Sequence, residues 1–288
     1  ITLVLSTNSK KMLKNKVLVR KMVGIETAGS LNILFTDKTG TITNGKMEVI
    51  SILDGSLKEY NNINELSSSY RQILIDSIIY NNESEYDATT NKIIGGNITD
   101  KSLLSFAGQN KKETIKITDK LIFNSQNKYS ISIIEKNNKK IKLIKGAPDV
   151  ILKYTTNYID KNGKSKYLDK EKLISIIKEK TNKGIRAIAV STSQSIYPID
   201  NIRRNTLIGI IFIKDEIRKD AKDGLNLIKS AGINTIMITG DSKETATSIA
   251  EEVGIVRNKN DIIISSNELK KINDDELKKI IPKLKVVS

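Results

Sequence analysis

Beyond Asn205 the sequence alternates short apolar segments with amphipathic ones, and this pattern limits the fold more than any other feature. The amphipathic segments are typical of helices that end at Gly232 and Gly254, the second beginning at Asp241 or Ser242. Strands and helices that alternate in this way predict a parallel sheet covered on both faces. The three apolar segments are "TLIGIIFI" (206–213), "NTIMITG" (234–240) and "KLKVVS" (283–288).

Far upstream, Leu31 to Thr36 has the same buried-strand character and ends at Asp37, so we expect it to join that sheet. The residues between have a different pattern, with Asn- and Ser-rich loops and a probable hairpin, "KYSISIIE" and "KIKLIK" around the turn "KNNK". Helical patterns at 148–154 and 170–181 and the strand-like "IRAIAVST" complete a mixed antiparallel α+β block. The simplest interpretation is one α/β domain, residues 31–46 plus 206–288, that carries an inserted domain, residues 47–205.

The first 30 residues form a third region. Ile1 to Leu5 is apolar, and the basic residues after it are mixed with Met12, Leu13, Val17 and Leu18 in a roughly helical pattern. Two interpretations are open from spacing alone. The region is either an ordinary surface helix or the cytoplasmic end of a membrane helix whose Lys and Arg follow the positive-inside rule.

Composition excludes several kinds of chemistry. The 288 residues contain no Cys and no His, which removes disulfides, thiolate nucleophiles, imidazole bases and the usual zinc ligands. The net charge is +15, but the basic residues are interspersed with Asn and Ile, and aromatic residues make up 5%. No basic and aromatic surface suited to base stacking is apparent, so we expect no nucleic-acid partner.

Polar residues follow the predicted strands where they end. Asp37, Asp215 and the "TGD" of Thr239 to Asp241 would meet at one edge if all three strands belong to one parallel sheet, since ligands bind there. A single Asp after a strand is more often a turn residue. Together with the Gly-containing turn "KTGT" after Asp37, however, these groups predict a site for a phosphoryl group and a hard cation.

Without Cys or His, a carboxylate is the remaining strong nucleophile, and Asp37 has a glycine turn beside it through which the backbone can approach an anion. Its attack on a terminal phosphate would give an aspartyl-phosphate. Thr39 stands where phosphatases of related layout place a second Asp as general acid and base. Because a hydroxyl cannot do that work near neutral pH, the acyl-phosphate should persist.

Several motifs resemble those of P-type ATPases, in the same order and spacing. "DKTGTIT" at Asp37 to Thr43 matches the family's phosphorylation motif. The others are "FNSQNKYS" (123–130), "KGAPD" (145–149), "KGIRAIAV" (183–190), "DEIR" (215–218) and "TGDSKETA" (239–246). The resemblance covers almost the whole chain. The sequence around Asp37 is most similar to the calcium and sodium/potassium branch of the family, with bacterial calcium pumps nearest.

The resemblance implies a HAD-like Rossmannoid phosphorylation domain with an inserted α+β antiparallel nucleotide-binding domain. It implies phosphorylation of Asp37 beside Lys38, Mg²⁺ held by Asp37 and Thr39, and a phosphate loop of Thr239, Gly240 and Asp241. The implied ATP-binding residues are Asp100, Phe123 stacking on the base, Lys128, Lys145, Gly146, Arg186, Asp215 and Arg218. A core phenylalanine and solvated lysines are the structural alternative for the inserted domain.

The chain departs from the family pattern in places. In "GNITDKSLL" (96–104), Asp100 stands where the family has a Glu that contacts adenine, and Glu216 follows Asp215 where proline is usual. The sequence ends at Ser288, before the family's G-D-G-x-N-D segment and the lysine preceding it. Because that segment supplies a magnesium ligand, the resemblance implies a further Mg²⁺ ligand beyond Ser288. We therefore expect these residues alone to bind ATP without completing a phosphorylation site.

The resulting hypothesis is the catalytic part of an ATP-driven cation pump, with Ca²⁺ as the expected cargo. It would lie at the cytoplasmic face of a membrane, expected to be a bacterial plasma membrane. Residues 1–30 would be the end of a membrane helix and a stalk, and the cation would bind membrane helices outside this sequence. The rival interpretations are a soluble phosphatase with an aspartate nucleophile and a module that only binds ATP.

Overall fold

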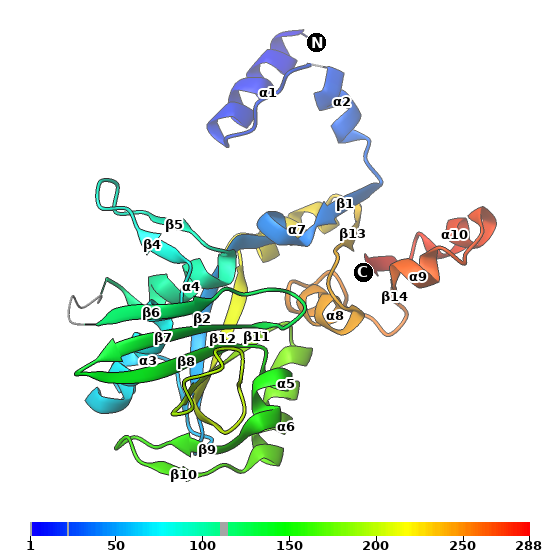
Figure 1. Ribbon diagram of the computed structural model, residues 1–288. Helices are drawn as coiled ribbons and strands as arrows, with labels where there is room; N and C mark the ends of the chain where they lie inside the picture. Colours follow the sequence, from blue (N-terminus) through cyan, green and yellow to red (C-terminus); the bar gives the residue numbers. More distant parts are fainter. Residues whose placement is uncertain (1, 22, 110–114) are drawn as a thin grey trace. The chain divides into compact units, whose positions relative to one another are not determined.

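A computed structural model describes residues 2–21, 23–109 and 115–288 of the chain. The chain forms two compact units (Figure 1). Unit 1 is made of residues 1–42 and 218–288, and unit 2 of residues 43–217. The expected boundaries at 46/47 and 205/206 differ from this division because two long strands extend to residues 43 and 217 within unit 2.

Unit 1 contains a four-stranded sheet in the order β1-β13-β15-β14, in which every neighbouring pair is parallel. Its strands are β1 (Ile33–Asp37), β13 (Asn234–Ile238), β14 (Ile262–Ile264) and β15 (Leu284–Val287). Ile236, Ile264 and Leu284 form the centre of its buried cluster. The parallel sheet predicted from strand–helix alternation is therefore confirmed, and "NTIMITG", "KLKVVS" and the strand before Asp37 all belong to it.

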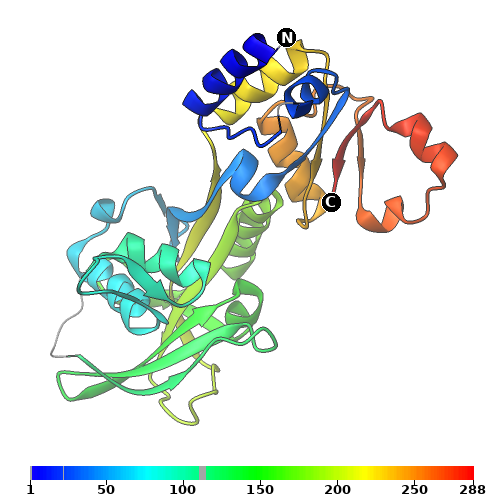
Figure 2. The ribbon, with the colours of Figure 1, turned by 90° about the horizontal axis from the view of Figure 1, so that it is seen from above.

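Helices flank this sheet, as Figure 2 shows for α8 and the strands beside it. α7 contacts β13, and α8 contacts β14 and β15. Ser242 caps α8 by accepting a hydrogen bond from the Thr245 amide. Among the described residues no helix is both long and apolar enough to cross a membrane. The helical elements described in unit 1 are α1 (Thr2–Lys14), α2 (Val23–Gly29), the kinked turn η1 (Lys38–Ile42), α7 (Ala221–Ser230), α8 (Lys243–Glu252), α9 (Ser266–Leu269) and α10 (Asp274–Ile280).

Unit 2 is built on a largely antiparallel sheet in the order β10-β9-β12-β11-β8-β7-β6, with β2 pairing β12 and β3. A separate pair, β4 and β5, forms a small hairpin. The strands are β2 (Thr43–Asp54), β3 (Glu59–Tyr60), β4 (Ser84–Tyr86), β5 (Ile93–Gly95), β6 (Lys116–Leu121), β7 (Tyr129–Lys136), β8 (Lys139–Gly146), β9 (Thr155–Ile159), β10 (Ser165–Tyr167), β11 (Arg186–Ser193) and β12 (Asn205–Ile217).

Helices cover both faces of this sheet because the apolar residues of its central strands alternate. On one face Ile52 and Ile211 pack with residues of α3 and α4, and on the other Leu53 and Phe212 pack with residues of α5 and α6. The two layers are visible in Figure 1. The helices are η2 (Ile63–Glu65), α3 (Ser68–Tyr80), α4 (Ile98–Ala107), α5 (Pro148–Ile151), η3 (Leu152–Tyr154) and α6 (Lys170–Asn182).

The predicted hairpin is confirmed as β7 and β8, which pair from Tyr129↔Gly146 to Lys136↔Lys139. Asn137 and Asn138 form its turn with φ of 51° and 58°. Asparagine tolerates this left-handed backbone better than most residues, and two such residues in succession suit a tight hairpin turn.

The sequence analysis assigned one strand to the wrong sheet. "TLIGIIFI" was expected in the parallel sheet, but it lies in β12, which pairs antiparallel with β2 and β11 in unit 2. An apolar run buried on both faces looks the same in a parallel sheet and in the centre of an antiparallel one that helices cover. Asp215 consequently lies in unit 2, opposite Met47, and does not follow a strand of the parallel sheet.

Candidate functional sites

The first candidate site begins where β1 ends in unit 1. Asp37 is its last residue, pairs with Ile238 at the end of β13, and has an exposed side chain. The chain then turns through Thr39 (φ −75°, ψ 121°) and Gly40 (φ 75°, ψ −3°). The positive φ of Gly40 suits a residue without a Cβ. The turn thus leaves the Asp37 carboxylate at the open edge of the sheet.

Neighbouring backbone orients this carboxylate. The Lys38 amide donates a hydrogen bond to Oδ1 of Asp37 at 2.7 Å. Because the amide takes one carboxylate oxygen, the other oxygen of this exposed group is in a position to react. Asp37 therefore has the accessibility that a nucleophilic carboxylate needs.

The second polar segment of unit 1 follows the adjacent strand, β13. The Thr239 amide donates to the Val287 carbonyl at 3.0 Å, and the Asp241 amide donates to Oγ1 of Thr239 at 3.3 Å. Asp241 also forms an ion pair with Lys38, with 2.7 Å between Oδ2 and Nζ. The structure therefore brings Asp37, Lys38, Thr239, Gly240 and Asp241 to one edge of the sheet, after two neighbouring parallel strands.

The oxygen donors at this edge are compatible with a hard cation. The donors predicted for Mg²⁺, the Asp37 carboxylate and the Thr39 backbone carbonyl, belong to the class that Mg²⁺ prefers, and Mg²⁺ usually keeps waters and substrate oxygens as its other ligands. No group of three or more Asp, Glu, Cys or His side chains that could hold a metal occurs in the described part of the chain. The Asp37 carboxylate and the Thr39 carbonyl would therefore be enough for a Mg²⁺ ion whose other ligands are water and phosphate oxygens.

The further Mg²⁺ ligand that the resemblance places beyond Ser288 falls outside the given sequence, so it stays a prediction. Ser288 itself follows β15, and its amide donates a hydrogen bond to the Ile264 carbonyl at the end of β14 at 3.0 Å. This contact ties the last described residue to the sheet of unit 1. Ser288 is therefore a structural residue of the sheet edge, and no metal-binding role is assigned to it.

The second candidate site is a pocket of about 720 Å³ within unit 2. It lies where the start of α4 faces the end of β8 and the beginning of β11. Six of the predicted ATP-binding residues line it: Asp100, Phe123, Lys128, Lys145, Gly146 and Arg186. These residues are spread over 87 positions of the sequence, from 100 to 186, and folding brings them together in one pocket.

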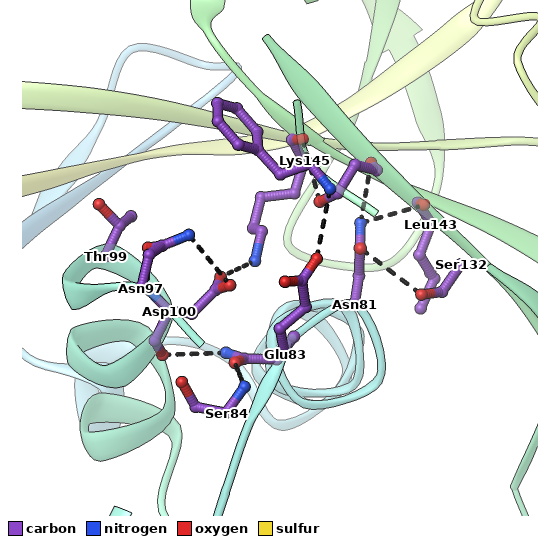
Figure 3. A network of polar contacts seen from close by, with 12 residues as sticks. Asn81, Glu83, Ser84, Asn97, Thr99, Asp100, Ser132, Leu143 and Lys145 are labelled. Atoms are coloured by element: carbon purple, nitrogen blue, oxygen red, sulfur yellow. Dashed lines mark hydrogen bonds and ion pairs between the residues drawn. The ribbon is translucent and has the colours of Figure 1, made fainter. Parts of the chain in front are cut away.

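A buried ion pair forms the floor of this pocket. Nζ of Lys145, on β8, contacts Oδ1 of Asp100, in the first turn of α4 (Figure 3). The side chains are 8% and 4% exposed. Burial lowers the pKa of Lys145, and the nearby Asp100 carboxylate opposes that shift. A buried pair of this kind is retained only when its remaining polar atoms also have partners.

Asn97 supplies one of those partners and was not among the predicted site residues. Its Oδ1 accepts a hydrogen bond from the Asp100 amide at 2.9 Å, which caps α4, and its Nδ2 donates to Oδ2 of Asp100 at 3.3 Å. Its position directly before Ile98, where α4 begins, could have identified it from the sequence, because Asn is a common helix N-cap residue. Both oxygens of Asp100 are therefore engaged, one by Lys145 and the other by Asn97.

A second layer of hydrogen bonds supports the pair from behind. Nδ2 of Asn82 donates to the Asp100 carbonyl at 3.0 Å, and Oδ1 of Asn82 accepts from the Ser84 amide at 2.7 Å. Nδ2 of Asn81 donates to the carbonyls of Ser130 and Leu143, which joins the end of α3 to β7 and β8 (Figure 3). Asn81 and Asn82, which lie in an Asn-rich segment that was predicted to be a loop, are thus buried structural residues.

The mouth of the pocket combines an aromatic ring with cationic groups. Phe123 is 45% exposed, which leaves ring surface available for stacking. Nη1 of Arg186 donates to Oγ1 of Thr99 at 2.9 Å, and Nζ of Lys128 lies 3.7 Å from Oδ2 of Asp149. A flat apolar surface beside several cations suits a molecule with an aromatic ring and phosphate groups.

Gly146 lets the backbone of two strands approach at the pocket wall. A Cβ at this position would collide with the Lys128 carbonyl oxygen and would lie 2.6 Å from Cβ of Tyr129. The Lys128 carbonyl accepts a hydrogen bond from the Ala147 amide at 2.9 Å. Glycine is therefore required here by close packing between β8 and the start of β7.

Two further residues predicted to bind nucleotide are not in the lining of this pocket. Oδ2 of Asp215, on β12, accepts a 2.6 Å hydrogen bond from Oγ1 of Thr43 on β2. Arg218 belongs to unit 1, where its Nε donates to Asp220 at 3.2 Å. Asp215 joins two strands of unit 2, and any contact of these two residues with nucleotide stays a prediction.

Comparison with known proteins places this arrangement in a family. The family model described as "P-type ATPase, cytoplasmic domain N" matches residues 69–220, more than half of the chain. The chain belongs to the P-type ATPase family. The match ends near the second crossing between the two units and contains every lining residue of the 720 Å³ pocket.

Curated relatives match along almost the whole chain. Calcium-transporting ATPase 1 of Bacillus cereus is 31% identical over 99% of this chain and 33% of its own length. A plasma membrane-type calcium-transporting ATPase 10 of rice is 32% identical over the whole chain and 31% of its own length, and Calcium-transporting ATPase 1 of yeast is 30% identical over 98% and 33%. The chain thus spans about a third of the length of these P-type ATPases.

The range of organisms bears on the expected location. Relatives from a bacterium, a plant and a yeast match at similar identity, so the expectation of a bacterial plasma membrane is not supported. The description of the matching family model is consistent with the coarser expectation, a domain at the cytoplasmic face of a membrane protein.

Proposed function

We propose that this chain forms the catalytic cytoplasmic part of an ATP-driven cation pump, with Ca²⁺ as the cargo, and that Asp37 accepts the γ-phosphate of ATP. The supporting observation is the position of the exposed Asp37 carboxylate at the end of β1, beside the Thr239–Asp241 segment at the end of β13. The Ca²⁺ assignment rests on relatives named as calcium-transporting ATPases.

In the proposed reaction, the free carboxylate oxygen of Asp37 attacks the γ-phosphorus. The bond between that phosphorus and the β–γ bridging oxygen breaks, and ADP leaves with the electron pair. The Lys38 amide holds the other carboxylate oxygen. The Gly240 amide and the Thr239 hydroxyl would donate hydrogen bonds to the phosphate, because the Thr239 and Asp241 amides already have partners. Mg²⁺ bound at Asp37 and Thr39 would supply charge neutralisation for the phosphates.

Thr39 explains why the proposed aspartyl-phosphate should resist hydrolysis. No carboxylate stands two positions after Asp37, so the site lacks the general base that a phosphatase would use to activate water. The aspartyl-phosphate should persist long enough to drive a conformational cycle in the rest of a pump. This argues against the soluble phosphatase interpretation.

The pocket of unit 2 is proposed to bind the ATP. Phe123 would stack on the base, Lys128 and Arg186 would attract the phosphates, and the buried Asp100–Lys145 pair would fix the floor. Because all these groups belong to unit 2, ATP binding should not require the proposed phosphorylation loop of unit 1, by which we mean residues 37–42 together with residues 239–241. ATP binding without phosphorylation is therefore the second candidate function for this chain taken alone.

A labelling experiment separates these functions. This chain, and a longer form with the segments by which the relatives extend beyond it, would be incubated with γ-labelled ATP and Mg²⁺. We expect ATP binding in both and an acid-stable, hydroxylamine-sensitive label in the longer form. Asp37→Asn should abolish the label and preserve binding. A label that survives this substitution, or fast release of phosphate from p-nitrophenyl phosphate, would contradict the proposal.

A further inference from the structure

A small hollow in unit 1 lies away from the phosphorylation loop. It has a volume of about 120 Å³ and is lined by residues of α7, β13, β15 and the segment that follows α8. Ile233 and Thr235 contribute to its wall from the beginning of β13, whereas Thr239–Asp241 follow the end of that strand. The hollow is thus at the opposite end of β13 from the proposed phosphate loop.

The charges around this hollow do not balance. Lys229 comes from α7, Arg257 from the loop after α8 and Lys285 from β15, and the single acidic lining residue is Asp261. Three cations and one anion leave an excess of two positive charges. Like charges gathered in a small concave site raise the local concentration of counter-ions.

The carboxylate is held largely by the backbone. Oδ2 of Asp261 accepts hydrogen bonds from the amides of Arg257 at 2.7 Å and Asn258 at 2.9 Å. Burial opposes the ionisation of Asp261, but these amides and the charges of Lys285 and Lys229 keep its pKa below the ordinary value. Asp261 therefore remains ionised at neutral pH and acts mainly to shape the loop that carries Arg257.

The cations retain capacity for another ligand. Among the described residues, the side-chain ammonium of Lys229 has no hydrogen-bond or ion-pair partner, although its charge acts on Asp261 at longer range. Arg257 directs Nε to the Gly254 carbonyl and Nη2 to Oδ1 of Asn226, which fixes the guanidinium plane. Lys285 contacts Oδ1 of Asn234 through one of its three N–H groups. N–H groups of all three side chains therefore remain for an anion, and those of Arg257 are held in a fixed plane.

We propose that this hollow binds a dianionic phosphate group, held by Lys229, Arg257 and Lys285. The volume of about 120 Å³ leaves room for one tetrahedral oxyanion. Guanidinium groups bind phosphate in a bidentate manner, and flexible lysines add point charge. Leu225 and Ile255 contribute an apolar part of the wall.

The experiment titrates the whole chain with inorganic phosphate while NMR follows the amides of Thr235, Gly254 and Asn258. We expect saturable shifts at these three amides, and binding about five- to tenfold weaker in Lys229→Gln and in Arg257→Gln. Lys222→Gln, an exposed lysine on α7 that does not line the hollow, is the matched control and should change nothing. Asp37→Asn should also leave these shifts intact.

Parallel titrations identify the source of the phosphate group. Stronger shifts with inorganic phosphate than with phosphoserine would indicate a free ion, and the reverse would indicate a phosphomonoester. Unchanged amides up to about 20 mM of either ligand would overturn the proposal, as would equal binding by wild type, Lys229→Gln and Arg257→Gln. Because the readout lies in unit 1 and needs no ATP, failure here would leave the proposed pump function untouched.

Discussion

The proposed phosphorylation loop of unit 1 and the proposed nucleotide pocket of unit 2 use charge in opposite ways. In unit 1, Asp37 is exposed, and the Lys38–Asp241 pair is partly exposed, at 12% and 30%. In unit 2, the Asp100–Lys145 pair is buried at 4% and 8% and is surrounded by asparagine hydrogen bonds. If the proposed function holds, the exposed loop is free to change partners during the reaction, whereas the buried contacts of the pocket form a preformed binding site.

The largest expected effect comes from removing one member of the buried pair. Lys145→Met should destabilise unit 2 by about 3–5 kcal/mol, because it leaves the Asp100 carboxylate buried without its cation. Chemical denaturation followed by circular dichroism measures this change, and ATP affinity should fall in the same variant.

The double variant Lys145→Met/Asp100→Leu is the control for that prediction. It removes both charges together, so it should recover most of the lost stability but not the ATP affinity. If Lys145→Met alone proved as stable as the wild type, the pair would not be the buried element described here.

The next largest effect contrasts two glycines, one in each site. Gly146→Ala places a Cβ against the Lys128 carbonyl oxygen and 2.6 Å from Cβ of Tyr129, so we expect a loss of about 2–3 kcal/mol and weaker ATP binding. Gly240→Ala meets no atom within 4 Å and should leave stability within about 0.5 kcal/mol of wild type. Thermal unfolding and nucleotide titration of both variants would test this difference. An equal loss of stability in the two variants would contradict the prediction.

A smaller effect is expected for the ion pair of the phosphorylation loop. A double-mutant cycle with Lys38→Gln and Asp241→Asn should give a coupling free energy of about 1 kcal/mol, because the pair is only partly shielded from water. The same cycle on Lys243 and Glu268, which are 40% and 51% exposed, should give about 0.3 kcal/mol. A coupling at Lys38–Asp241 as large as that of the buried pair would remove the contrast between the sites.

The smallest effect concerns the exposed carboxylate of Glu268 in unit 1. Hydrogen bonds from the Ser265 amide and then Lys243 lower its pKa from 4.5 to about 2. Its contribution to stability is therefore present above pH 4.5 and lost as the pH falls toward 2. NMR titration should give the lowered pKa, and Lys243→Gln should raise it. A pKa near 4.5 in the wild type would contradict the prediction.

Much of the phosphorylation loop could be predicted from sequence because it depends on local order. A buried strand that ends at Asp37, a glycine turn and a Thr-Gly-Asp segment after a later strand are all readable without knowing the contacts. The strand that contains Asp215 was assigned to the wrong sheet. Its apolar pattern indicates burial but does not name the strands beside it, which are β2 and β11.

The pocket was predictable only in part. The resemblance indicated six residues that the structure gathers, but local patterns gave no reason for Asp100 and Lys145 to meet across 45 positions. The supporting residues Asn81, Asn82 and Asn97 were hidden among loop-like asparagines, because composition does not distinguish a buried amide with several hydrogen bonds from a solvated one.

The ends of unit 2 have a consequence for how such a chain can be altered. Thr43 and Ile217 pair in register where β2 and β12 meet, and Thr43 is also hydrogen bonded to Asp215. Since the two ends of the segment 43–217 are adjacent, the segment can be exchanged as a cassette. A gene could lose the segment 43–217, gain it, or receive a version that prefers another ligand. Unit 1 would then need only the same two connections, at residues 42–43 and 217–218.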